Sequence, residues 1–98
     1  MVDFQELAKI RLELETQIPA FPINGCNDAA NRLKDKGLQI VQGLIRTAQG
    51  WEEHLFGYNQ REKVYVDISA DQFHGHSKKV LITPVNNNSI YRNINVWE

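Results

Sequence analysis

The apolar positions of residues 3–17 recur every three or four places, at Phe4, Leu7, Ile10 and Leu14. Glu6, Lys9 and Glu13 line another face, which is typical of an amphipathic helix with one side turned toward a core. Pro19 and Pro22 then force the chain into extended backbone, because proline lacks a backbone donor and pushes the residue before it out of the helical region. A new element is therefore expected after residue 23.

A second helix is predicted from Cys26 to about Gly37. Asn24 and Gly25 supply a cap at its start, and Gly37 can end it as a C-terminal cap. Cys26 falls in the first turn of this helix.

From Leu38 onward the pattern changes to that of strands separated by turn residues. The expected turns lie at Gln49-Gly50, Asn59-Gln60, Gly75 and Asn86–Ser89. The expected strands are Gln39–Thr47, Trp51–Tyr58, Lys63–Ser69, Lys79–Thr83 and Ile90–Trp97. This order predicts an α+β fold in which N-terminal helices, one carrying the cysteine at its N-terminus, pack on an antiparallel β-sheet. The length of 98 residues predicts a single domain, 1–98.

The net charge and the lengths of the apolar runs limit the kinds of partner that we expect. A formal charge of -1 and a pI near 6.3 give no general attraction to nucleic acid or to an anionic membrane. No apolar run approaches the ~20 residues of a membrane helix, and residues 1–10 lack the features of a signal peptide. We therefore expect a soluble protein, with neither nucleic acid nor a membrane as partner.

The chain has one cysteine, Cys26, so an internal disulfide is impossible and an all-cysteine zinc site is excluded. A lone cysteine is either an inert core residue or a reactive thiol. The start of a helix favours the second interpretation, because unpaired N–H groups and the helix dipole stabilise a thiolate there. The same N–H groups can receive an oxyanion, and Gly25 is expected to leave room for a substrate.

A histidine and an aspartate on two neighbouring strands complete a candidate triad. A turn at Asn59-Gln60 puts His54 opposite Tyr65 and diagonal to Asp67 on the same face, within reach of a hydrogen bond. A register change of one residue would separate the two side chains. The other face of the second strand is expected to pack on the helices through Val64, Val66 and Ile68.

Several segments in this order carry a family resemblance. They are Asn24-Gly25-Cys26-Asn27-Asp28-Ala29-Ala30 with Leu33 and Gly37, then Val41-Gln42-Gly43, His54, Val66-Asp67 and Asp71-Gln72-Phe73. Over about residues 20–74 the chain resembles the core of papain-like and transglutaminase-like domains. The resemblance implies a papain-like core and cysteine attack on a carboxamide or peptide carbonyl without a cofactor. In these roles Cys26 is the nucleophile, His54 the general base and Asp67 the residue that orients the histidine.

The small size resembles the papain-fold toxin domains of bacterial polymorphic toxins and related effector domains that deamidate glutamine. This implies a protein or peptide substrate, a possible immunity protein as partner, and a place in the cytoplasm or in a target cell reached as part of a larger protein. Two features depart from the pattern. Leu55 stands where many relatives have an aromatic residue, and the oxyanion-hole glutamine has only Gln17 and Asn24 as candidates. Gln72 could cap or buttress the turn after Asp67, or simply be exposed.

Three alternatives stay open. A leader-peptide protease of a peptide-maturation pathway shares the same chemistry. A non-enzymatic binding module would contain Cys26 as an inert core residue. His74 and His76 could bind zinc from one side of a strand, but no third ligand accompanies them, and we expect a loop there and no metal site.

Overall fold

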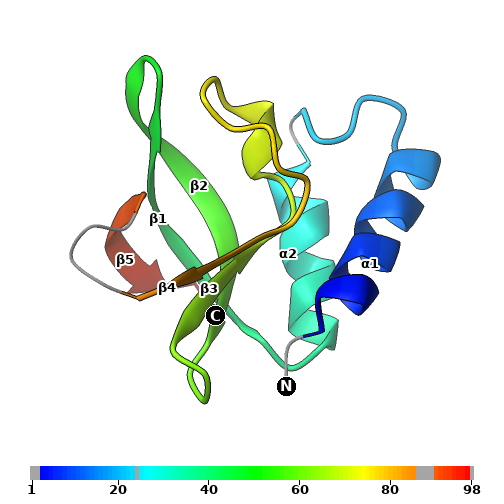
Figure 1. Cartoon of the computed structure of the whole chain (residues 1–98), viewed down its shortest axis with the longest axis horizontal. Helices are drawn as coiled ribbons and strands as arrows, with labels where there is room; N and C mark the ends of the chain where they lie inside the picture. The colour runs from blue at the N-terminus through cyan, green and yellow to red at the C-terminus, as the bar shows by residue number, and fades with distance from the viewer. Residues whose placement is uncertain (1–2, 24, 86–89, 98) are drawn as a thin grey trace.

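A computed structural model of the chain describes residues 3–23, 25–85 and 90–97. It confirms the α+β class: two helices pack on a five-stranded antiparallel sheet (Figure 1). The helices are α1 (Phe4–Gln17) and α2 (Cys26–Asp35), and a 3-10 turn, η1, spans Ala70–Gln72. The strands are β1 (Gln39–Thr47), β2 (Gly50–Asn59), β3 (Val64–Asp67), β4 (Leu81–Pro84) and β5 (Tyr91–Val96).

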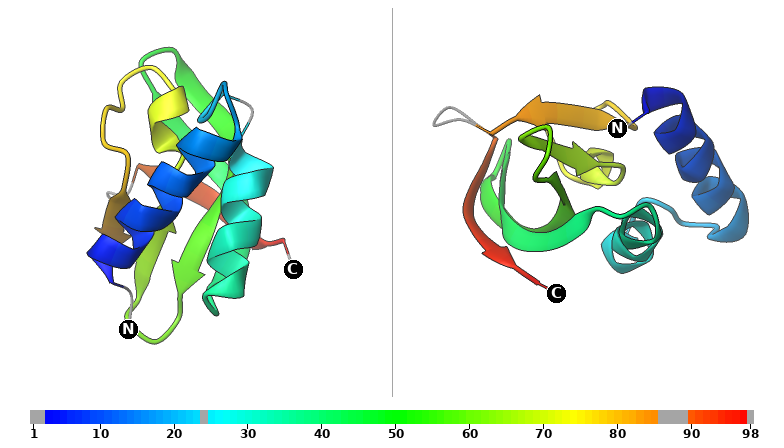
Figure 2. Two further views of the ribbon diagram at one scale, coloured as in Figure 1. Left: turned by 90° about the vertical axis from the view of Figure 1, so that its right-hand side faces the viewer. Right: turned by 90° about the horizontal axis from the view of Figure 1, so that it is seen from below.

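The strands follow one another in the order β4-β3-β2-β1-β5, and every neighbouring pair is antiparallel. The pairing of β2 with β3 confirms the predicted hairpin between these segments. The sheet is strongly curled, so that its edge strands β4 and β5 come round toward each other on the side away from the helices (Figure 2). This curl encloses a second apolar layer inside the sheet.

The sheet therefore has a core on each face. The helix-side core joins α1 and α2 to the outer face of the sheet, through Leu7, Ile10, Leu14, Phe21, Ala29, Ala30, Leu33, Leu38, Ile40, Leu55, Val66, Ile68 and Val80. The inner core fills the curl with Val41, Ile45, Phe56, Tyr65, Ala70 and Tyr91. Val64 packs against the helix-side core as well, which confirms the predicted facing of Val64, Val66 and Ile68.

Arg11 ties α1 to the segment that follows β3, a role that the sequence pattern does not indicate. Its side chain is 4% exposed and forms a double hydrogen bond with the carboxylate of Asp71, at 2.6 and 2.8 Å. It also donates to the carbonyl oxygen of Ile68 at 3.0 Å and to Glu15 at 2.9 Å. Planar two-point pairing of this kind fixes geometry as well as charge. Helix α1 is thereby held against the end of β3.

Two of the four predicted turns, at Gly50 and Gly75, contain a glycine with a positive φ, and so does the predicted cap of α2 at Gly37. Gly37, at φ +84°, follows the end of α2, and Gly50, at φ +119°, closes the β1–β2 hairpin opposite Thr47. The two-residue turn predicted at Asn59-Gln60 is wrong: the loop runs over residues 60–63, and Tyr58 pairs with Tyr65. Asn59 shapes this longer loop, since its Oδ1 accepts hydrogen bonds from the N–H groups of Arg61 and Glu62.

The loop predicted at Asn86–Ser89 lies outside the described residues. Within the described ranges, neither helix is long and apolar enough to cross a membrane.

Candidate catalytic site

The site lies where β3 separates from β2. These strands pair over three residues only, from Asn59 opposite Val64 to Gly57 opposite Val66. The predicted pairing of His54 with Tyr65 is therefore wrong. The expected register pairs Tyr58 with Arg61, whereas the structure pairs Tyr58 with Tyr65, which shifts β3 by four residues. An even shift keeps every side chain on its face. His54 and Asp67 consequently remain on the same face.

His54 and Asp67 form a buried pair. The Nε2 of His54 lies 2.8 Å from the Oδ2 of Asp67, and the two side chains are 0% and 1% exposed. Two further groups donate to the same carboxylate: the backbone N–H of Ser69 to Oδ1 at 3.0 Å, and the hydroxyl of Tyr91 to Oδ2 at 2.6 Å. A buried carboxylate with three donors can stay ionised.

Ionisation of this pair is coupled. Burial, the largest single influence, would raise the pKa of Asp67, but the charge and hydrogen bond of His54, together with the hydrogen bonds from Tyr91 and Ser69, outweigh burial and lower the pKa. Burial would lower the pKa of His54, but the charge and hydrogen bond of Asp67, with a smaller contribution from Cys26, outweigh burial and raise it from 6.5 to about 9. Each group therefore favours the charged form of the other.

The carboxylate also fixes the tautomer of the imidazole. Because an ionised carboxylate only accepts, the Nε2 of His54 carries the proton that it donates to Asp67. The Nδ1 is buried and has no partner of full hydrogen-bond geometry among the described residues. Nε2 is thus bound to the aspartate, and Nδ1 of the neutral imidazole can accept a proton.

Cys26 lies close to this imidazole. It is the first residue of α2 and is partly exposed. A loose hydrogen-bonding contact with His54, outside regular hydrogen-bond geometry, is the largest cause that lowers the pKa of the Cys26 thiol; burial opposes it, and the charge of His54 adds to it. Such loose contacts are common in nucleophile–base pairs without substrate. The three predicted triad residues are thus close together.

The separation of the strands also exposes a backbone donor to the thiol. No residue of β3 pairs with Leu55, since the ladder ends at Gly57. The N–H of Leu55, together with that of Cys26, contributes to lowering the pKa of the Cys26 thiol. The thiolate is therefore stabilised by an imidazole and by backbone donors from α2 and β2.

Aromatic rings hold the imidazole of His54 in place. The ring of Phe73 meets it edge-on, with centroids 4.9 Å apart, and the ring of Phe56 stacks near it at 5.6 Å. Fixed packing of this sort restricts the ring to the orientation that serves both Asp67 and Cys26.

The supporting residues predicted from the sequence have different outcomes. Gly25 caps α2, but the room it leaves is not open to a substrate, because a Cβ there would lie 2.5 Å from the ring of Phe21. Asn24 lies outside the described residues. Gln17 is exposed at the end of α1. Gln72 donates from Nε2 to the carbonyl oxygen of Ser69 at 3.2 Å, and so supports the turn after Asp67.

The histidines of the loop after η1 have structural partners. The Nε2 of His76 lies 2.7 Å from the carbonyl oxygen of Arg46, and the carbonyl oxygen of His74 accepts from the N–H of Ala48. Within the described ranges, no group of three histidine, cysteine or acidic side chains is placed to bind a metal ion.

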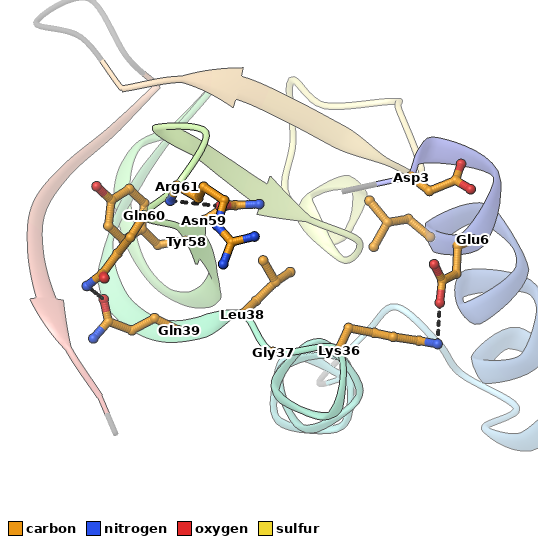
Figure 3. Close-up of a pocket in the computed structure, with 11 residues that line it drawn as sticks. Asp3, Glu6, Lys36, Gly37, Leu38, Gln39, Tyr58, Asn59, Gln60 and Arg61 are labelled. Carbon is orange, nitrogen blue, oxygen red and sulfur yellow. Dashed lines mark hydrogen bonds and ion pairs between the residues drawn. The ribbon is translucent and has the colours of Figure 1, made fainter. Parts of the chain in front are cut away.

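Two surface cavities lie apart from the triad. One, of about 960 Å³, is lined by the start of α1, the residues that follow α2 and the β2–β3 loop, at the opposite end of α2 from Cys26 (Figure 3). It contains the ion pair of Lys36 with Glu6. The other, of about 690 Å³, lies between α1 and β4. Neither is lined by a triad residue, so the chemistry of the site is inferred from side-chain arrangement.

Tyr91 is the site residue that the sequence does not reveal. It belongs to β5, 24 residues after Asp67, and no local motif connects the two.

Comparison with models of known protein families, with curated proteins and with solved structures finds no significant match. The function is therefore inferred from the geometry of the site.

Proposed function

We propose that this chain is a cysteine-dependent amide hydrolase of the papain-like or transglutaminase-like kind. The observation that supports it most is the placement of His54, with Nε2 on the buried carboxylate of Asp67, Nδ1 without a hydrogen-bond partner among the described residues, and the partly exposed thiol of Cys26 close to the imidazole. A nucleophile, a base within reach, and a third group that orients the base are the requirements for covalent acyl transfer.

The reaction proceeds through a thioester. The Sγ of Cys26 attacks the carbonyl carbon, and the thiol proton is held on Nδ1 of His54. When the tetrahedral intermediate collapses, the C–N bond breaks and the proton passes from Nδ1 to the leaving nitrogen. Water then attacks the thioester with Nδ1 as base, which releases the acid and restores the thiol. Asp67 remains ionised throughout and stabilises the imidazolium.

The oxyanion is received at the start of α2. The first turn of a helix leaves its N–H groups without partners inside the helix, and here the bond from the N–H of Ala29 to the carbonyl oxygen of Gly25 is the first of α2. The N–H of Cys26 is therefore available to the developing negative charge, in the field of the helix dipole. Gln17 and Asn24 remain the side-chain candidates for a second donor.

The substrate class follows from the reaction. A carboxamide of a protein glutamine and a peptide bond differ only in the leaving group, so both deamidation and proteolysis fit the same residues. We favour a protein or peptide substrate in the setting of a toxin or effector domain, with an immunity protein as its natural partner; a leader-peptide protease is the alternative within the same chemistry.

Alkylation of the thiol tests the proposal first. The second-order rate of Cys26 alkylation by iodoacetamide near neutral pH should be fast in the native protein and drop at least tenfold in His54→Ala, because the imidazole lowers the thiol's pKa. Equal, slow rates in both proteins would favour the non-enzymatic binding module.

Mass spectrometry of treated proteins then separates the products. A gain of about one mass unit at glutamine marks deamidation, whereas fragments mark proteolysis. Cys26→Ala is the matched control in both cases, and a product that this variant still forms would exclude Cys26 as the nucleophile.

A further inference from the structure

Tyr91 shares one oxygen atom with His54. Its hydroxyl donates to the Oδ2 of Asp67 at 2.6 Å, the oxygen that also accepts from the Nε2 of His54 at 2.8 Å. Tyr91 is 4% exposed and Asp67 1% exposed, so both bonds lie in the interior, away from bulk water. Hydrogen bonds to a buried charge are shorter and stronger than those between neutral groups.

The phenol acts as a fixed donor. Burial and the neighbouring charge of Asp67 raise the pKa of Tyr91, so its proton stays on the hydroxyl oxygen. A phenol has one proton to donate, and here the carboxylate receives it. Tyr91 therefore restricts the rotation of the carboxylate and withdraws part of the charge that Oδ2 presents to His54.

This contact depends on the curl of the sheet. Strands β5 and β3 are separated by β1 and β2, which in a flat sheet would place them roughly 14 Å apart. The curl brings β5 round toward β3 (Figure 2), and the hydroxyl of Tyr91 reaches the carboxylate of Asp67. Among the residues of β5, Tyr91 alone is buried. The last strand thus contributes one buried side chain, and its hydroxyl lies on the carboxylate of the triad.

We propose that Tyr91 is a positioning residue of the catalytic site, which holds Asp67 in the orientation that serves His54 and moderates the charge that the histidine receives. This inference rests on the proposed function for its catalytic meaning, although the link from Tyr91 through Asp67 to His54 can be measured without any substrate.

Ring packing is separable from the hydroxyl contact. The ring of Tyr91 stacks on Phe56, with centroids 4.1 Å apart, and meets Tyr65 edge-on at 5.3 Å. Tyr91→Phe retains the ring and removes the hydroxyl that donates to Asp67. Tyr65→Phe is the matched control, because it removes a hydroxyl from the same aromatic cluster, and no hydrogen bond joins that hydroxyl to Asp67 among the described residues.

The test is an NMR titration of the His54 imidazole in the two variants and the native protein. Without the Tyr91 donor, Oδ2 presents more negative charge to the imidazolium, and the His54 midpoint should rise by about one pH unit. It should stay unchanged in Tyr65→Phe. The pH profile of Cys26 alkylation should shift in Tyr91→Phe and not in Tyr65→Phe. An unchanged or lower midpoint in Tyr91→Phe, or an equal rise in both variants, would overturn the inference.

A second substitution keeps the test independent of stability. Site-specific replacement of Tyr91 by 3-fluorotyrosine retains the hydroxyl and makes it a stronger donor, so the His54 midpoint should move in the opposite direction, downward. A rise or no change with this residue would equally contradict the proposal. If the midpoints shift as expected while the native protein turns over no substrate, the link through Asp67 stands and the proposed hydrolase function fails.

Discussion

The Nε2 of His54 lies 2.8 Å from the Oδ2 of Asp67, although the strands that contain them no longer pair at that point. The backbone of Asp67 is held from the other side, where it pairs with Leu81 of β4. The backbone of Asp67 is therefore positioned by β4, and its side chain reaches His54 of β2. The opening between β2 and β3 allows Cys26 to approach the imidazole.

Replacing Cys26 by alanine should abolish turnover and leave the fold almost as stable. The thiol is partly exposed at the first position of α2 and packs at the margin of the helix-side core. We expect the free energy of unfolding to change by less than about 1 kcal/mol, measured by urea denaturation. A loss of several kcal/mol would mean that the residue fills the core, and the nucleophile assignment should then be dropped.

Asp67→Asn should reduce turnover at least about tenfold while preserving the structure. Asparagine can present an amide N–H to the imidazole and favour the wrong tautomer, and it cannot stabilise the imidazolium. The double variant Asp67→Asn, His54→Ala should be no worse than His54→Ala alone, because residues that act as one unit are not additive. Single-turnover rates for the three variants measure this; penalties that simply add would exclude Asp67 as the orienting residue.

Stability should depend on pH through His54. Because its pKa in the folded protein is raised from 6.5 to about 9, its contribution is complete below pH 6.5 and is lost as the pH rises to about 9. Asp67 has the opposite dependence: its lowered pKa gives stability that is present above 3.8 and lost on strong acidification.

The Cys26→Ala background suits this measurement, since it removes a thiol whose lowered pKa acts in the opposite sense to His54. Urea denaturation of Cys26→Ala should show a decrease in stability as the pH rises above 6.5, because Asp67 still raises the pKa of His54 there; without the contribution of Cys26, the decrease should be complete at a lower pH than in the native protein. The same decrease should be smaller once Asp67→Asn is added, and an equal decrease in both would show that the histidine is not coupled to the aspartate.

Arg11→Met should destabilise the protein by about 3 kcal/mol, because it leaves the carboxylate of Asp71 without its buried partner. Lys79→Met is the control: it removes an exposed ion pair with the same residue, Glu15, that also contacts Arg11, and should change stability by less than about 1 kcal/mol. Thermal or urea denaturation of both variants gives the comparison. Similar losses of stability in both variants would mean that the buried pair of Arg11 with Asp71 stabilises the protein no more than the exposed pair does.

Gly25→Ala should lower both stability and turnover. The added Cβ would lie 2.5 Å from the Phe21 ring, and overpacking of this kind costs about 1–3 kcal/mol. Since Gly25 directly precedes Cys26, any shift that relieves the clash moves the nucleophile. Adding Phe21→Leu should restore part of the stability, and failure to do so would show that the backbone, not the ring, requires glycine.

Local patterns predicted much of the fold. The bounds of β1 match the expected Gln39–Thr47, and the start and end of α2 follow the glycine signals at Gly25 and Gly37. The shared face of His54 and Asp67 was also predicted, because alternation along a strand survives any register shift by an even number of residues. The alternation of side chains along each strand, and not the position of the turn, determines that His54 and Asp67 share a face.

The remaining features depend on long-range geometry. The length of the β2–β3 loop follows from the side-chain hydrogen bonds of Asn59, which composition alone does not specify. The contact of Tyr91 with Asp67 requires the curl of the whole sheet, and the pairing of Arg11 with Asp71 joins residues 60 positions apart. No short motif in the sequence encodes such distances.

The triad is assembled from opposite sides of a single sheet. Cys26 comes from the layer in which the helices pack, whereas Asp67 and Tyr91 meet inside the curl. A partly unfolded chain that retains the sheet but releases α2 would contain every residue of the proposed triad and hydrolyse nothing. The proposed catalysis should therefore depend on the docking of α2 and be lost, on gradual denaturation, before the sheet unfolds; a helix of ten residues is not stable alone, so the helical circular dichroism should fall with the activity.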